Sequence, residues 1–170
     1  KFGGTSVGDI DKLNNVAEIV KNNLPNNKLI VVLSAMSGET DKMQKHIDDI
    51  ESTHKLENDL ILTSGEQVTV GILSAILKNK NINAIPLLGW QIPILTDNNH
   101  QKAKILNIDK KRIDKFLNKY EVIILAGFQG INLDGHITSL GRGGSDTTAV
   151  AVASAIDADR CDIYTDVDGV

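Results

Sequence analysis

The sequence predicts an α/β fold, a three-layer αβα sandwich with a mainly parallel central sheet. Short runs of β-branched and other apolar residues, typical of buried parallel strands, alternate along the chain with segments of helical period. Glycine-containing turns follow strand-like runs, and open α/β sheets bind ligands beyond the carboxyl ends of their strands. The chain has 170 residues, of which 41% are hydrophobic, so we expect one domain with a sizeable core over residues 1–170.

The first expected elements are a helix and a buried strand. Apolar residues recur at helical spacing over residues 13–24, and this segment lies between Gly8-Asp9, which can start a helix, and Pro25, which follows its end. The run KLIVVLSAM, residues 28–36, is short and rich in β-branched residues. It therefore predicts a strand that is buried in a parallel sheet.

Two further helices are expected before the next strand. Residues 38–54 predict a polar helix, and residues 56–78 predict an apolar helix that is interrupted at TSGEQ, residues 63–67. The inner face of the apolar helix is expected to carry Leu60, Val68, Ile72, Leu73, Ile76 and Leu77.

The second half of the chain repeats the alternation of strand and helix. Strands are expected over residues 82–89 (INAIPLLG) and 103–108 (AKILNI), and a helix over residues 110–117. The segment EVIILAGFQG, residues 121–130, is the clearest buried strand because its apolar run is continuous and ends in glycines.

The last segments predict a hairpin, a helix and a strand. Polar and apolar residues alternate over residues 130–141 around an LDG turn, which is a hairpin signal. Residues 146–156 (DTTAVAVASAI) predict a helix of small residues that can pack closely on a sheet, and residues 161–167 (CDIYTDV) predict a final strand.

Composition excludes several classes of function. The formal net charge is −4, with scattered Lys and Arg, so we expect no nucleic-acid partner. We expect no membrane partner, because no apolar run reaches the roughly 18 residues of a membrane span. The lone Cys161 excludes an intramolecular disulfide and favours a reducing, cytoplasmic location. The chain begins without Met and without a signal peptide, so we expect that residues upstream have been lost.

The histidines do not predict a metal site. His46, His54, His100 and His136 are dispersed and show no metal-ligand spacing with Cys161. We therefore expect no metal held by side chains, no Ser-His-Asp arrangement, and a core or surface role for each histidine.

Two loops near the N-terminus can bind anions. In KFGGTS, residues 1–6, adjacent glycines let backbone N–H groups approach a phosphate and Lys1 adds a positive charge, although an ordinary glycine turn explains the segment equally well. In LSAMSGET, residues 33–40, Ser34 and Thr40 supply small donors at a strand-to-helix junction, where a plain helix cap is the simpler interpretation.

A third loop, LGRGGSD, favours a functional interpretation. Gly143 and Gly144 can form an anion-accepting turn, and Arg142 offers a guanidinium fork suited to a carboxylate. Ser145 or Asp146 can cap the helix that follows, an interaction worth about 1 kcal/mol. The alternative is that Asp146 holds a donor or a lysine in place, since an acid beside an anion site otherwise lacks a structural reason.

Two further groups are candidates. Glu66 lies inside an otherwise apolar helix, so it either faces solvent or is a buried acceptor for a substrate cation. Thr165 and Asp166 lie at the end of the last expected strand, where ligands of α/β sheets bind.

Taken together, six segments resemble the aspartate kinases of the amino-acid kinase family. They are KFGGTSV, VVLSAMSGETD, TSGEQV, AGFQG, TSLGRGGSDTTA and YTDVDGV, in family order from end to end of the chain. The resemblance implies the αβα fold of that family and transfer of the ATP γ-phosphoryl group to the side-chain carboxylate of L-aspartate. The product is 4-phospho-L-aspartate, the first intermediate toward lysine, threonine, methionine and diaminopimelate.

The resemblance also implies a role for each candidate residue. The catalytic pair would be Lys1, which neutralises the transferring phosphoryl group, and Asp146, which orients Lys1. The aspartate site would comprise Thr40, Glu66, Arg142, Gly143, Gly144 and Ser145. The ATP site would comprise Lys1, Phe2, Gly3, Gly4, Ser34, Thr165 and Asp166. Mg²⁺ would be bound mainly through the ATP phosphates, with no protein ligand assigned.

The chain departs from the family by truncation. Family members continue past YTDVDG with the rest of the nucleotide pocket and regulatory ACT domains, so we expect the aspartate half of the site, an edge of the ATP half, and little or no kinase activity in isolation. The full-length form is expected to be a homo-oligomer. Two alternatives are an inactive remnant that acts only as an assembly module, and a sister enzyme acting on glutamate, N-acetylglutamate or a nucleoside monophosphate.

Overall fold

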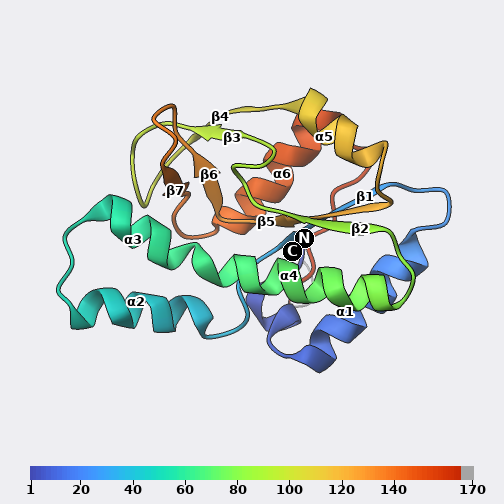
Figure 1. The fold of residues 1–170 in the computed structure, drawn as a ribbon, viewed down its shortest axis with the longest axis horizontal. Helices are drawn as coiled ribbons and strands as arrows, with labels where there is room; N and C mark the ends of the chain where they lie inside the picture. Colours follow the sequence, from blue (N-terminus) through green and yellow to red (C-terminus); the bar gives the residue numbers. More distant parts are fainter. Residues whose placement is uncertain (166–170) are drawn as a thin grey trace.

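The structure, a computed structural model, describes residues 1–165 (Figure 1). Its elements, in chain order, are η1 (Gly4–Val7), α1 (Ile10–Asn23), β1 (Leu29–Leu33), α2 (Glu39–Asp49), α3 (Lys55–Leu62), α4 (Ser64–Asn79), β2 (Ala84–Leu87), β3 (Ile94–Thr96), β4 (Ile105–Ile108), α5 (Lys110–Leu117), β5 (Val122–Ala126), β6 (Gln129–Ile131), β7 (Ile137–Ser139) and α6 (Gly144–Ile156).

A parallel sheet of order β1-β5-β2 forms the centre of the molecule. The middle strand β5 is buried along its whole length, as its continuous apolar run predicts. Leu33 of β1 is paired with Ala126 of β5, so the carboxyl ends of these two strands lie side by side. The loops that follow both strands therefore begin at the same edge of the sheet.

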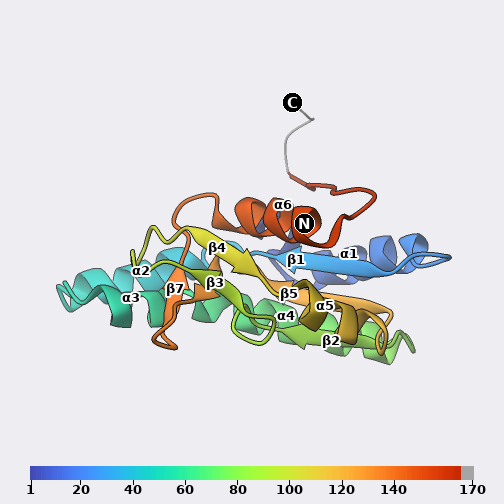
Figure 2. The same ribbon diagram turned by 90° about the horizontal axis from the view of Figure 1, so that it is seen from above.

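Helices cover both faces of this sheet. Val122, Ile124 and Ala126 of β5 belong to the core shared with α1 and α4, whereas Ile123 and Leu125 belong to the core shared with α5 and α6. Figure 2 shows α4 and α6 on opposite sides of the strands. The period of two along β5 thus builds the predicted αβα sandwich.

A second, mixed sheet of order β4-β3-β6-β7 extends the fold. The strands β3 and β4 are antiparallel, β3 and β6 are parallel, and β6 and β7 form the predicted hairpin, with Gly135 in the left-handed region of its turn (φ 83°). The strand β3 is absent from the sequence prediction. Its three residues, Ile94–Thr96, are too few to show a period.

The predicted apolar helix is two helices that meet at Thr63. Both the N–H and the hydroxyl of Thr63 donate to the carbonyl of Asp59, at 3.0 and 2.8 Å. Leu73 and Leu77 are buried as predicted, and Ile72 and Ile76 are half-buried.

The prediction was wrong for Leu60 and Val68, which are 55% and 57% exposed. Val68 lies two positions from both Glu66 and Val70, which are buried, and two positions is about 200° around a helix. It therefore faces outward. The stretch Lys55–Asn79 is long and apolar enough to cross a membrane by length and composition alone, but half of its apolar 18-residue window is buried within the fold, and a core helix meets the same criteria.

The expected last strand is reduced to a single bridge within the described residues. Tyr164 pairs with Phe2 in parallel, and its N–H donates to the carbonyl of Lys1 at 2.9 Å. The two aromatic rings stack with centroids 4.4 Å apart. This contact attaches the C-terminal segment beside the N-terminal one.

Two glycines provide a test of the packing. A Cβ on Gly130 would lie 2.5 Å from Thr96 Cγ2 and 2.6 Å from the Ile94 carbonyl oxygen, so Gly130→Ala is expected to lower the free energy of unfolding by about 2 kcal/mol. Gly71 on α4 has open space around it, so Gly71→Ala is expected to raise this free energy by about 0.5–1 kcal/mol. Urea unfolding of both variants checks this, and changes of the same sign would contradict the described packing.

Candidate active site

Three backbone segments meet where β1 and β5 end. The N–H of Phe2 donates to the Val32 carbonyl at 3.0 Å, and the N–H of Ser34 donates to the Phe2 carbonyl at 3.2 Å. Across the sheet, the N–H of Gly127 donates to the Leu33 carbonyl at 2.9 Å. The loops that contain Lys1, Ser34 and Phe128 are therefore held together by main-chain hydrogen bonds.

Lys1 and Asp146 form an ion pair across this junction. Lys1 Nζ lies 2.7 Å from Asp146 Oδ1, and the lysine side chain is only 9% exposed. Asp146 lies in the first turn of α6, whose N-cap is Gly143 in the left-handed region (φ 75°) without a side-chain cap. The expectation that Ser145 or Asp146 caps this helix was therefore wrong. Asp146 pairs with Lys1 instead.

Glu66 has a buried carboxyl group, one oxygen of which has no hydrogen-bond partner among the described residues. Its side chain is 3% exposed, and Oε1 accepts a hydrogen bond from the Ala35 N–H at 3.1 Å. Among the described residues, Oε2 is buried without a hydrogen-bond partner. Burial raises the pKa of the Glu66 carboxyl from 4.5 to about 7. Glu66 is thus buried and does not face solvent, and its unpaired oxygen leaves an acceptor position open to a ligand.

A cavity of about 220 Å³ contains every residue predicted for the aspartate site. It is lined by Lys1, Ser34, Thr40, Glu66, Phe128, Gly141, Arg142, Gly143, Gly144, Ser145 and Asp146. Its charges are two cations and two carboxyl groups. A small ligand that carries both signs of charge matches this wall better than a simple anion.

A larger cavity of about 790 Å³ adjoins the first and shares Lys1, Ser34, Thr40 and Asp146 with it. The remainder of its wall is Gly3, Gly4, Thr5, Ala35, Met36, Ser37, Gly38, Asp41, Ile163, Tyr164 and Thr165. A Cβ on Gly4 would lie 3.0 Å from the Ala35 carbonyl oxygen, so a glycine suits this close approach. The Lys1–Asp146 pair lies where the two cavities meet.

Two residues of the predicted ATP site, Phe2 and Asp166, are not among the described residues that line the larger cavity. The Phe2 side chain is 4% exposed, packs in the core and does not line either described cavity, so only its backbone is near the site. Asp166 lies outside the described residues. Phe128, in the left-handed region (φ 68°), also lines the smaller cavity, although the sequence predicted no site role for it beyond its place in the AGFQG motif.

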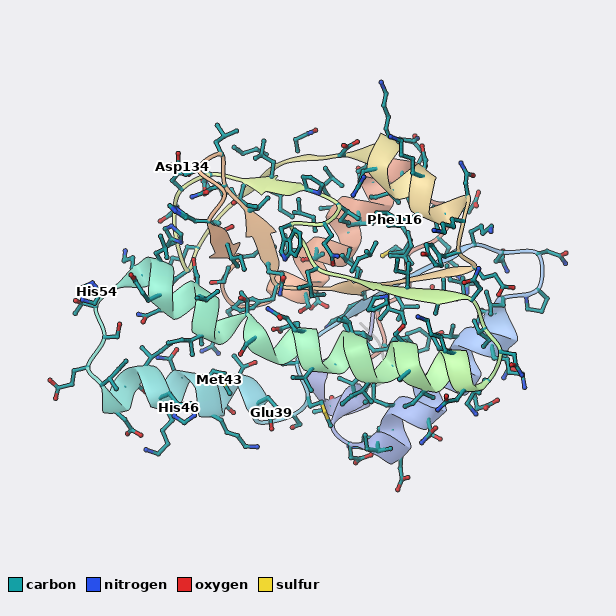
Figure 3. All side chains as sticks on the ribbon, viewed as in Figure 1. Glu39, Met43, His46, His54, Phe116 and Asp134 are labelled. Atoms are coloured by element: carbon teal, nitrogen blue, oxygen red, sulfur yellow. The ribbon has the colours of Figure 1, made fainter. Side chains whose placement is uncertain are left out.

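The histidines lie apart from this site. Figure 3 shows His46 on α2 and His54 in the loop that leads to α3, and both are exposed. His136 is also exposed, whereas His100 is 15% exposed and its Nδ1 lies 2.7 Å from Asp59 Oδ2. In the part of the chain that the structure describes, no three His, Cys, Asp or Glu side chains gather where they could hold a metal ion.

Comparison with known proteins adds the family. Residues 1–170 match the family model described as the amino acid kinase family. The chain belongs to this family. It is 46% identical over 175 residues to an aspartokinase of Rickettsia conorii and 50% identical over 174 residues to an aspartate kinase of Pseudomonas putida.

The similarity extends to solved structures. The fold resembles the crystal structure of E. coli aspartokinase III in complex with aspartate and ADP, with a TM-score of 0.84 and 26% sequence identity over 99% of the chain. These amino acid kinases are longer. The chain spans 44% and 42% of its Rickettsia and Pseudomonas relatives and 48% of the E. coli structure.

The raised pKa of Glu66 predicts how stability depends on pH. Between pH 4.5 and about 7 the folded protein holds a proton that the unfolded chain has released, so the free energy of unfolding falls as pH rises through this window. The decrease from this one group is about 3 kcal/mol. Urea unfolding at pH 5, 6, 7 and 8 measures it.

Glu66→Gln is expected to remove this decrease, and Glu57→Gln, on the exposed part of α3, is the matched control that retains it. An unchanged pH dependence in Glu66→Gln would show that the buried carboxyl is not the titrating group.

Proposed function

We propose that this chain is the aspartate-binding part of an aspartate kinase, which transfers the γ-phosphoryl group of ATP to the side-chain carboxylate of L-aspartate. The observation that carries the proposal is the Lys1–Asp146 ion pair at the junction of two cavities. A phosphoryl group that is transferred from a ligand in one cavity to a ligand in the other must pass through this junction. Family membership and the two aspartokinase relatives support the assignment.

The smaller cavity suits L-aspartate. Glu66 Oε2 would accept the α-ammonium group, since this buried oxygen otherwise has no partner among the described residues. Arg142 would bind the α-carboxylate, because a guanidinium fork matches carboxylate geometry. Thr40, Ser145 and the Gly143-Gly144 turn would bind the remaining oxygens at the N-terminus of α6.

The larger cavity suits the ATP phosphates. Gly3 and Gly4 leave room for phosphate oxygens, and Ser34 and Thr165 lie in the same wall. Mg²⁺ would be held mainly by the phosphates and would neutralise part of their charge. The complex of E. coli aspartokinase III with aspartate and ADP supports this choice of ligands.

The proposed reaction needs positioning rather than a base. An oxygen of the substrate carboxylate attacks the γ-phosphorus, the bond from phosphorus to the bridging oxygen breaks, and ADP leaves with that electron pair. Lys1 would neutralise the charge on the transferring group. Asp146 would hold Lys1 in place, since a carboxylate nucleophile has no proton to lose.

The proposal extends to the setting of the enzyme. The reaction belongs to amino-acid biosynthesis, and the exposed thiol of Cys161 suits a reducing cytoplasm. We propose that the chain in isolation has little activity and that the complete gene product is a homo-oligomer. Tests of activity therefore use the complete gene product.

The ion pair is tested by Lys1→Met and Asp146→Asn. Each is expected to lower kcat for L-aspartate by about 100-fold or more, because charge on the transferring phosphoryl group loses its preorganised partner. The matched control is Lys80→Met, which removes a pair of the same 2.7 Å length, Lys80–Glu18, on the surface. Near-normal turnover in both site variants would contradict the proposed roles.

The substrate is tested by competition between amino acids. The wild-type protein is expected to prefer L-aspartate over N-acetyl-L-aspartate by about 100-fold or more in kcat/KM, because the acetylated nitrogen carries no charge for Glu66. Glu66→Gln is expected to lower the ratio of kcat/KM for L-aspartate to kcat/KM for N-acetyl-L-aspartate, because the variant has no carboxylate to bind the ammonium group.

A preference for an N-acetylated substrate, for L-glutamate or for a nucleoside monophosphate would indicate a sister enzyme. Failure of calorimetry to detect specific binding of both aspartate and ATP would favour an assembly module instead.

A further inference from the structure

A buried carboxylate outside the cavities joins three separate segments of the chain. Asp59, on α3, is fully buried. Its Oδ2 lies 2.7 Å from His100 Nδ1, both oxygens accept from the Gln101 N–H at 3.1 Å, and Oδ1 accepts from the Ser139 hydroxyl at 2.5 Å. Serine binds the carboxylate rather than the imidazole, so this is no Ser-His-Asp nucleophile. The proposed chemistry does not use any of these groups.

One side of this network reaches the loop that carries Arg142. The loop begins after Ser139, and a Cβ on Gly141 would lie only 3.0 Å from the Gln101 carbonyl oxygen. Gln101 itself is held in the left-handed region (φ 68°), which a non-glycine residue seldom adopts unless its surroundings impose it. The Asp59 carboxylate holds the N–H of this residue, so it fixes the surface on which Gly141 packs.

The helix that carries Asp59 leads to Glu66 through main-chain hydrogen bonds. The Asp59 carbonyl accepts from the N–H and the hydroxyl of Thr63, and the Thr63 carbonyl accepts from Gln129 Nε2 at 3.1 Å. Thr63 is the N-cap of α4, and Glu66 lies in the first turn of that helix. Figures 1 and 2 show β7 and the β3–β4 loop at the same end of the molecule as α3.

We propose that Asp59, with His100 as its partner, is a positioning residue that sets Arg142 and Glu66 at the separation required by an amino-acid substrate. This inference rests on the proposed function. The inference deepens the proposed function, because the distance between the carboxylate-binding group and the ammonium-binding group determines which substrate fits. The network lies on the amino-acid side of the ion pair, so ATP binding does not depend on it.

The test compares His100→Ala with His100→Asn in the complete gene product. Alanine removes the hydrogen bond to Asp59, whereas the asparagine amide can donate from near the position of Nδ1. His100→Ala is expected to raise KM for L-aspartate about tenfold and to change KM for ATP less than about twofold. His100→Asn is expected to restore most of the affinity for aspartate. Ser139→Ala, which leaves the other bonds to Asp59 in place, is expected to have a smaller effect of the same kind.

Thr96→Val is the matched control. It removes another buried hydrogen bond, the one between the hydroxyls of Thr96 and Thr138 at 2.6 Å, within the mixed sheet that also contains Ser139. It is expected to lower thermal stability without changing either KM. If His100→Ala behaves like Thr96→Val, or changes both KM values equally, the network is only structural and the proposal is overturned. If the wild-type protein phosphorylates no L-aspartate, the proposed function itself is wrong and this inference falls with it.

Discussion

The parallel pairing of β1 with β5 is the constraint on which the site depends. Because Leu33 is in register with Ala126, the two strands end together and their loops open at one edge. The N-terminal segment adds to the same edge through the hydrogen bonds between Phe2 and β1. A register shift on either side would separate Lys1 from Asp146 and divide the smaller cavity, since its wall combines the N-terminal segment and the β1 edge with residues of α2, α4 and α6.

The balance of charge in the smaller cavity has a thermodynamic consequence. Burying the Glu66 carboxyl with one unpaired oxygen opposes folding at neutral pH, and the hydrogen bond from the Ala35 N–H offsets only part of this cost, because burial still raises the pKa of the group. A ligand that supplies an ammonium group offsets it on binding. Under the proposed function, this desolvation cost in the free protein would be recovered as affinity for a substrate that carries an ammonium group.

Much of the fold and the site was predictable where local chemistry decides. The apolar run of β5 predicted the central strand, the glycine-rich loops predicted residues that line the two cavities, and the resemblance led to the pairing of Lys1 with Asp146. Features that depend on distant contacts were not predictable. The link between Asp59 and His100 joins residues 41 positions apart, and the Phe128 N–H donates to the Thr148 hydroxyl 20 positions away, so no short sequence window records either contact. The outward direction of Val68 follows from the phase of α4, which the count of apolar residues did not take into account.

Glu66 is the residue proposed to receive the substrate ammonium, and proton release on binding tests this role most directly. Because burial raises its pKa to about 7, the Glu66 carboxyl holds a proton over part of the neutral pH range, and an ammonium group beside it would drive that proton off. Calorimetric titration of L-aspartate into the complete gene product, in buffers of different ionisation enthalpy at pH 6 and 7, is expected to show proton release on aspartate binding, and none in Glu66→Gln. Aspartate binding without proton release, or equal release in both proteins, would contradict the account.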